Sequence, residues 1–452
     1  MTGSILLTLL LTANGVQAQQ GSFEAKLRQI SESSREAVRA NDIPALSIGI
    51  HWQGRIHFIN HGTYRRDSPD KVSQTSIYQL ASLSKTFVGI VANQLIRDGK
   101  LKLNDSICTH LTSLSESAKS KLQPIKIQHL LGHTSGLPRT SASRKVGRIG
   151  VNLKYGTKEL MQELERIELE FQPGSEFRYS NFGFALLAHV CENASGKPYP
   201  ALVRKLVTEP HKMDDTAFVI DQVQSKRLVT PYNNINRKQP GAPWVMGKLG
   251  PPSALYSTVA DLTALMQAQI RAYREHENAS KSSRLVLNTK RSTKTTGLSY
   301  GFGFFDWGDG TFGHGGGMDG YGSQYHICPK ADFGFVFLTS SCGAWQEILS
   351  QRISSILQGK SAKDWTPFDP AEQITQMFQV QGVEAAMQLY TQFRSAKPSP
   401  LNLGSRLRLA ESANTIGKPE LATMVLQHAA IDFPNSKEVK SALKALNHKR
   451  RP

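Results

Sequence analysis

Cysteine is scarce in this chain of 452 residues. The cysteines are widely spaced and include no C-x-x-C pair, which argues against a structural zinc site and against a small fold held together by disulfides. One bridge is compatible with an oxidising compartment, and buried free thiols are an equal alternative. The four residues are Cys108, Cys191, Cys328 and Cys342.

Long apolar runs are absent beyond the amino terminus, where the block from Ile5 to Ala13 is too short to span a bilayer. Small residues follow this block, and Val16 and Ala18 fit a signal-peptidase cut after Ala18. We therefore expect a signal peptide over residues 1–18 and no transmembrane segment in the mature chain. The protein is expected to be exported, to the periplasm or outside the cell.

Acidic residues are few beside basic ones, since 36 Asp and Glu oppose 54 Lys and Arg, a formal net charge of +18. A balance of this sign favours acidic partners. The basic residues are nevertheless scattered, and only His448 to Arg451 form a dense run. No basic stripe is interleaved with aromatic residues, so we do not expect nucleic-acid binding.

The strand and helix patterns predict the fold class. Alternating apolar and polar residues over 45–64 predict a β-hairpin, and strands return over 300–307, 322–328 and 333–340, before a last helix over 344–358. Mostly helical patterns lie between the two groups of strands. The sequence therefore predicts an α+β fold with one antiparallel β-sheet flanked by helices and an inserted helical subdomain.

The composition changes at residues 359–370, which predict a linker. Only helical patterns follow, and Gly382 and Gly417 have a spacing close to that of a two-helix repeat of the tetratricopeptide (TPR) kind. A generic helical tail is an equal alternative. We expect an α+β domain over 19–365 and an all-α, TPR-like extension over 366–452 that offers a surface for a protein partner.

The stretch YQLASLSKTF places Lys85 three residues after Ser82 at the predicted start of a helix. Residues at this spacing share one face of a helix. A serine hydroxyl needs an adjacent base to become a strong nucleophile, and a lysine with a depressed pKa is such a base. The pattern indicates a nucleophilic Ser82, whereas Ser84 points elsewhere. A helix cap beside a solvated lysine is the simpler alternative.

Two further segments have residue types that such a serine requires. Tyr179 and Asn181 flank a serine in the loop before a predicted helix, and His314 precedes three glycines at the edge of a predicted strand. Capping and packing explain each of them singly. His129 and His133 have the spacing of a zinc helix, but leucine follows His129 where the motif needs an acidic residue, so no metal site is expected.

Together, S-L-S-K at 82–85, Y-S-N at 179–181 and H-G-G at 314–316 resemble the three boxes of the serine β-lactamase and penicillin-binding-protein superfamily. The Y-x-N box is similar to that of the branch with class C β-lactamases, D-alanyl-D-alanine carboxypeptidases and esterases. The resemblance spans about residues 25–358. It implies a β-lactamase/transpeptidase-like fold.

The resemblance also implies roles for the matching residues. Ser82 is the acylated nucleophile, and Lys85 and Tyr179 share its proton, with a phenolate form of Tyr179 favoured by the nearby ammonium. The backbone N–H groups of Ser82 and Gly317 form an oxyanion hole.

The third box departs from the K-T-G pattern, because His314 stands where β-lactamases have lysine. His314 is expected to be a catalytic residue, and Asn181, Gly316 and Gly317 are expected to bind the substrate. A histidine is mostly neutral at pH 7 and attracts a substrate carboxylate less than lysine does.

The implied activity is that of a serine hydrolase that transfers acyl groups from small esters, amides or D-amino-acid peptides to water, without metal or cofactor. The departure at His314 favours an esterase or D-peptidase over an efficient β-lactamase, with a small or peptidoglycan-like molecule as substrate. The alternative is a penicillin-binding protein, or a degenerate sensor of the same fold whose helical tail recruits partners.

Overall fold

The computed structural model describes residues 23–142, 147–148, 155–234, 237–277, 299–343, 345–360, 401–415 and 419–448, with scattered positions between 371 and 399. The predicted signal peptide and residues 361–370 of the predicted linker lie outside the described residues. Within the described part of the chain, no helix has both the length and the apolar character needed to cross a membrane.

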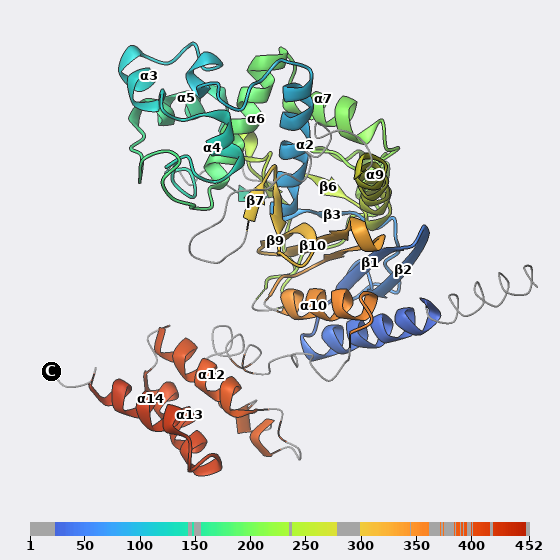
Figure 1. Ribbon diagram of the computed structural model, residues 1–452. Coiled ribbons are helices and arrows are strands. Elements are labelled where there is room, and N and C mark those ends of the chain that lie inside the picture. The colour runs from blue at the N-terminus through green and yellow to red at the C-terminus, as the bar shows by residue number, and fades with distance from the viewer. Residues whose placement is uncertain are drawn as a thin grey trace, which may run out of the picture.

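An antiparallel sheet of seven strands forms the centre of the fold, in the order β2-β1-β11-β10-β9-β8-β7 (Figure 1). β1 pairs with β11, so the two remote ends of the domain meet in the sheet, as the sequence predicted. The strands are Ala45–Trp52 (β1), Arg55–Gly62 (β2), Ser299–Gly301 (β7), Phe304–Asp306 (β8), Phe312–Met318 (β9), Tyr321–Cys328 (β10) and Phe333–Thr339 (β11).

The predicted single strand over 300–307 is wrong, because the chain reverses there and forms the hairpin β7–β8. Phe302 and Gly303 have φ angles of 51° and 83°, the left-handed conformation that two-residue hairpin turns require. The next strand, β9, contains the histidine and glycines of the third box. β8 pairs with β9 only through Gly313 and Phe312, so the outer edge of β9 from residue 314 on has no strand partner in the described ranges.

Helices cover both faces of the sheet, and each interface has its own hydrophobic core (Figure 1). Side chains of β11 point alternately into the two cores. Phe335 and Phe337 pack in the first core, and Val336 and Leu338 pack in the second. The first core includes the helix at 23–40 and α10 (Trp345–Leu357), and the second includes α2 (Ser84–Arg97) and α9 (Val259–Glu277).

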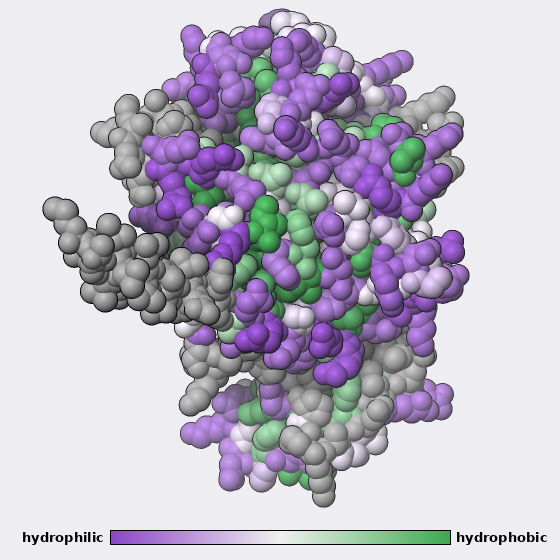
Figure 2. All heavy atoms as spheres, turned by 90° about the vertical axis from the view of Figure 1, so that its right-hand side faces the viewer, coloured by the Kyte–Doolittle hydropathy of each residue, from purple (hydrophilic) through white to green (hydrophobic). Residues whose placement is uncertain are grey.

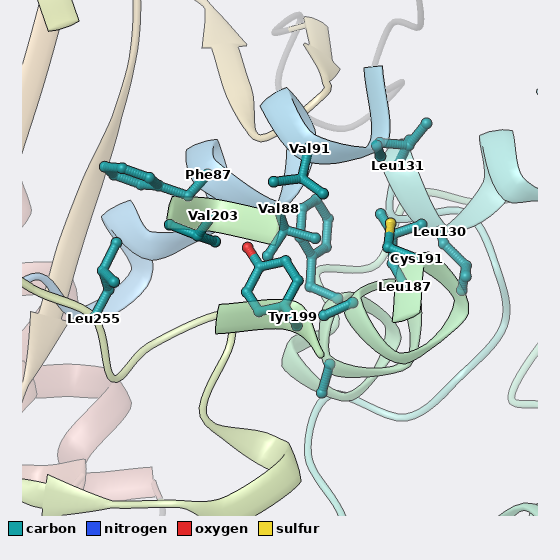
Figure 3. Close-up of a cluster of buried hydrophobic side chains, with 14 of the residues drawn as sticks. Phe87, Val88, Val91, Leu130, Leu131, Leu187, Cys191, Tyr199, Val203 and Leu255 are labelled. Carbon is teal, nitrogen blue, oxygen red and sulfur yellow. The ribbon is translucent and has the colours of Figure 1, made fainter. Parts of the chain in front are cut away.

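The inserted helical subdomain packs around α2. Figure 3 shows Val88 and Val91 of α2 among residues of the inserted helices that include Leu187 of α6 (Asn181–Ser195) and Tyr199 of α7 (Tyr199–Val203), all of them buried. This packing holds α2 against the inserted helices. The other elements of the insertion are η2 (Ile107–Thr109), α3 (Glu116–Leu122), α4 (Ile127–Leu131), α5 (Thr157–Arg166), η3 (Arg204–Thr208) and α8 (Gln222–Ser225).

Two short strand pairs and three short turns complete the domain. β3 (Tyr78–Gln79) pairs with β6 (Tyr256–Ser257), and β4 (Gly147–Arg148) pairs with β5 (Trp244–Val245). The short turns are η1 (Ala81–Leu83), η4 (Gly247–Leu249) and η6 (Pro329–Ala331).

All four cysteines are free thiols, which selects the free-thiol alternative over a disulfide bridge. Three of them are buried, and Cys342 is partly exposed. The face that carries α9 and the hairpin β1–β2 is mostly hydrophilic, with apolar residues gathered toward its middle (Figure 2). This distribution is that of an ordinary globular surface.

After residue 400, the described residues form the helices α12 (Leu403–Thr415), α13 (Pro419–Asp432) and α14 (Lys437–His448). Leu409, Leu421, Val425 and other apolar residues give them a core separate from both cores of the domain. The helical extension is therefore present, while its relationship to tetratricopeptide repeats stays a prediction.

Because the extension has its own core, we propose that the domain boundary lies near residue 365. A chain ending there is expected to fold, to keep kcat/KM for an ester within about threefold of the full-length value, and to lose less than about 5 °C in the Tm of the domain. Circular dichroism and ester hydrolysis check this. A folded truncated chain without activity would show that the extension completes the active site.

Candidate active site

Ser82 lies in the turn η1, immediately before α2. The preceding residue, Ala81, has a φ of 49°, an uncommon conformation for a residue with a side chain, and strain of this kind persists only when the surroundings enforce it. Leu80 supplies that restraint, because its N–H donates to the Leu255 carbonyl at 2.8 Å and its carbonyl accepts from the Ser323 hydroxyl at 2.6 Å. The turn presents a partly exposed Ser82 at the start of the helix.

Lys85 is fully buried directly behind Ser82. Its Nζ lies 3.1 Å from Ser82 Oγ and 3.1 Å from the Pro252 carbonyl oxygen. A neutral amine can donate a hydrogen to that carbonyl while its lone pair accepts the serine proton. The predicted pairing of Ser82 with Lys85 is thus present in the geometry, although α2 begins only at Ser84.

The surroundings of Lys85 favour its neutral form. Burial lowers the pKa of Lys85 well below its ordinary value, and the positive charge of Arg139 lowers it further. A lysine that is neutral near pH 7 can act as a general base, which a fully protonated lysine cannot.

Tyr179 ends the loop that leads into α6. Its ring centroid lies 4.9 Å from Lys85 Nζ, and its hydroxyl lies 3.5 Å from His314 Nε2. Burial raises the pKa of Tyr179 above its ordinary value, although a hydrogen bond with Ser82 and the charge of Arg139 act in the opposite direction. Burial of the two groups favours a neutral phenol beside a neutral amine over the expected phenolate–ammonium pair.

His314 lies on β9 and is buried. Its Nδ1 lies 2.5 Å from the Gly315 carbonyl oxygen, so Nδ1 carries the hydrogen and Nε2 presents a lone pair to Tyr179. Burial is the main cause that lowers the pKa of His314 to about 3, and the charge of Lys85, when that residue is protonated, acts in the same direction. His314 is a neutral acceptor in this site, so it does not supply the fixed positive charge of a lysine box.

Gly316 lets β9 approach the serine turn closely. A β-carbon at Gly316 would lie 2.5 Å from the Leu80 carbonyl oxygen and 3.0 Å from the Ser82 backbone nitrogen. No other residue fits at this distance. Gly317 follows on β9 and is exposed, and its predicted part in the oxyanion hole stays a prediction.

Asn181 is the first residue of α6, which Ser180 caps by accepting the Gly183 N–H at 2.8 Å. The backbone N–H of Asn181 donates to the Arg139 carbonyl at 2.8 Å. The side-chain oxygen of Asn181 is buried and has no hydrogen-bond partner among the described residues. The predicted contact between Asn181 and a substrate stays a prediction.

The sequence patterns did not single out two neighbours of Tyr179. The Arg139 guanidinium lies 5.2 Å from the Tyr179 ring centroid, on the face of an electron-rich ring. His133, which the sequence analysis examined only as half of a zinc-helix spacing, is buried, and its ring centroid lies 4.3 Å from that of Tyr179. Its Nδ1 accepts the Ser180 N–H at 3.1 Å. His133 therefore orients the loop that contains Tyr179, and Arg139 places a positive charge beside the Tyr179 ring.

These contacts form a chain of polar groups from Lys85 through Ser82 and Tyr179 to His314. Such a chain has the elements of covalent acyl transfer, namely a nucleophile, an adjacent base and a second group that can carry a proton. No group of three metal-ligating side chains occurs within the described ranges.

Known proteins show similarity over the same region. The family model described as Beta-lactamase matches residues 24–346. Protein flp of Staphylococcus aureus (strain COL) is 27% identical over 323 residues, which cover 69% of this chain and 63% of that protein. The D-alanyl-D-alanine-carboxypeptidase/endopeptidase AmpH of Escherichia coli (strain K12) is 28% identical over 249 residues, 53% of this chain and 62% of that protein. The chain thus spans a little under two thirds of these relatives.

A solved structure supports the fold independently. The crystal structure of a beta-lactamase/D-alanine carboxypeptidase from Pseudomonas syringae has a TM-score of 0.63 with 19% sequence identity, and the match covers 73% of this chain and 99% of that one. At this identity the likeness shows the fold alone. Because the family model matches well over half of the chain, this protein belongs to the Beta-lactamase family, within the serine β-lactamase and penicillin-binding-protein superfamily.

Proposed function

We propose that this protein is a serine hydrolase that acts through an acyl-enzyme on small esters, amides or D-amino-acid peptides. The observation that carries the proposal is the position of Lys85 Nζ, which is fully buried and lies 3.1 Å from the hydroxyl of a partly exposed Ser82. Burial lowers the pKa of Lys85, which favours the neutral amine. A fully buried lysine without a function is costly, because burial penalises its charged form. The same arrangement is what a serine nucleophile requires.

The proposed reaction has two steps. Ser82 Oγ bonds to the acyl carbon while its proton passes to Lys85 Nζ. The bond from that carbon to the alcohol or amine then breaks, and the same proton passes from Lys85 by way of Tyr179 to the leaving group. In the second step a water oxygen bonds to the acyl carbon, one proton of the water passes by way of Lys85 to Ser82 Oγ, and the bond from Ser82 to the acyl carbon breaks to release the acid. The backbone N–H groups of Ser82 and Gly317 are proposed to stabilise the oxyanion, at about 3 kcal/mol for each donor.

A second candidate is a penicillin-binding or sensor protein that is acylated without turnover. The low pKa of His314, about 3, favours this candidate, because so weak a base gives little help to a water molecule in deacylation. Intact mass after exposure to a β-lactam or a fluorophosphonate separates the two. A stable adduct on Ser82 without ester turnover supports the binder, whereas rapid recovery of the free protein supports the hydrolase.

We propose export to the periplasm or the exterior on the basis of the signal-peptide pattern at 1–18. The helices after residue 365 are proposed to offer a surface to a protein partner. Amino-terminal sequencing of the protein secreted from its host checks the first of these, and a cut after Ala18 is expected.

The neutral His314 predicts a preference among substrates. With its pKa lowered to about 3, His314 carries no positive charge at pH 7.5, so the attraction for a substrate carboxylate is weak. We expect kcat/KM for p-nitrophenyl butyrate to exceed that for a chromogenic cephalosporin by about tenfold or more. Parallel measurements at pH 7.5 check this. A tenfold preference for the cephalosporin would contradict it.

A further inference from the structure

An apolar hollow of about 480 Å³ lies beside the candidate active site. Its size is within the range of pockets that enclose small organic ligands. None of the described lining residues carries a formal charge. The apolar part of the lining consists of Phe182, Trp244, Met246, Leu249 and Met318.

The hollow begins at the site itself. Asn181, at the start of α6, is one of its lining residues, and Met318 lines it from β9, two residues beyond Gly316. Ser253 also lines it, and the residue before it, Pro252, accepts the hydrogen bond from Lys85 Nζ. The hollow therefore borders Asn181 and residues next in sequence to the groups that surround Ser82 and Lys85.

Hydrogen bonds hold the Trp244 wall in place. The Gln79 side chain accepts the Trp244 N–H at 2.8 Å and donates to the Trp244 carbonyl at 2.9 Å. The indole N–H donates to the Asp319 carbonyl at 2.7 Å. A wall that is fixed before binding loses little conformational freedom when a ligand enters, so its apolar surface is available to discriminate between ligands.

The position of the proton carriers identifies which half of the substrate enters the hollow. The leaving alcohol or amine must take its proton near the Tyr179 hydroxyl and His314 Nε2, and neither residue lines the hollow. The acyl group stays attached to Ser82 and has to extend away from those two groups. The hollow is thus on the side of the acyl group.

We propose that this hollow binds the acyl part of the substrate and selects uncharged, apolar acyl groups longer than butyryl, such as medium-length alkanoyl or aryl groups. This inference rests on the proposed serine-hydrolase function. An acyl chain that fills the hollow removes the apolar surfaces of Trp244, Met246 and Leu249 from water. Each added methylene is expected to raise kcat/KM by up to about fourfold until the hollow is full.

Hydrolysis of p-nitrophenyl acetate, butyrate, hexanoate and octanoate by the full chain tests the proposal. We expect kcat/KM to rise at least tenfold from acetate to hexanoate. We also expect ethyl octanoate to be preferred over octyl acetate, since only the former places the long chain on the acyl side. Equal kcat/KM values across the series, or a preference for octyl acetate, would overturn the proposal.

Two neighbouring residues supply a matched pair of variants. Met246 lines the hollow, whereas Val245 is exposed and is not among the lining residues. Met246→Trp is expected to fill the hollow and to lower the octanoate-to-acetate ratio of kcat/KM at least tenfold, whereas Val245→Trp should leave this ratio within about twofold of wild type. A similar ratio in both variants would count against the proposal.

The outcome in wild-type protein separates this inference from the function on which it rests. Absence of acylation and of all ester turnover would overturn the serine-hydrolase function and the acyl hollow together. Turnover of every ester at the same rate would leave the serine-hydrolase function intact and overturn the acyl hollow alone. The wild-type series does not depend on whether Met246→Trp folds.

Discussion

Replacing Ser82 with alanine is expected to lower ester kcat/KM by about 10,000-fold or more, a loss of about 5 kcal/mol of transition-state stabilisation. The substitution removes the only atom that can form the acyl-enzyme at this position, while the oxyanion donors and binding surfaces remain. Covalent labelling by a fluorophosphonate should disappear as well. Steady-state kinetics and intact mass measure both effects.

Ser84→Ala is the matched control, because Ser84 is two residues away at the first position of α2 and is buried. Its hydroxyl accepts the Leu255 N–H at 3.4 Å, so its loss is expected to cost about 1 kcal/mol of stability without affecting the nucleophile. Labelling retained in the Ser82 variant, or lost in a folded Ser84 variant, would contradict the assignment of the nucleophile.

Lys85→Met is expected to lower kcat/KM by about 100- to 10,000-fold, because general-base assistance to the serine is lost while the buried volume is nearly conserved. Lys85→Arg should not restore activity, since arginine stays protonated at any pH where the protein is folded. A folded Lys85→Arg protein with more than about a tenth of wild-type activity would show that Lys85 acts by its charge and not as a base.

The pH dependence of kcat/KM is a second test of Lys85 as the general base. Activity requires neutral Lys85, so kcat/KM should rise with pH through the lowered pKa of Lys85. The positive charge of Arg139 disfavours protonated Lys85, so Arg139→Gln should raise the pKa of Lys85 and move the acidic limb of the pH profile to higher pH. Arg139→Lys keeps the charge and should leave the limb in place.

Local spacing made part of the site predictable. The pairing of Ser82 with Lys85 depends only on the i, i+3 geometry of one turn of helix, which a sequence displays directly. The meeting of Tyr179 with His314 joins residues 135 positions apart, and only the resemblance to a known family suggested it. The pairing of β1 with β11 was predictable because the strand patterns occur at the two ends of one domain.

The ionisation of the site could not be predicted, because it depends on burial. Lys85 beside Tyr179 suggests an ammonium–phenolate pair on charge alone, but exclusion of water favours the neutral form of each group. Arg139 was missed because it lies in a loop, where no periodic pattern marks a functional residue. The hairpin at Phe302 and Gly303 was missed because apolar residues continue through the turn and conceal it.

The most direct test of the central claim is to trap the acyl-enzyme. Wild-type protein is mixed with a large excess of p-nitrophenyl butyrate, quenched in acid within the first turnovers, and examined by intact mass and peptide mapping. We predict a mass increase of one butyryl group, located on the peptide that contains Ser82. Turnover without any adduct, or an adduct on a residue other than Ser82, would contradict a mechanism in which Lys85 activates Ser82 as the nucleophile.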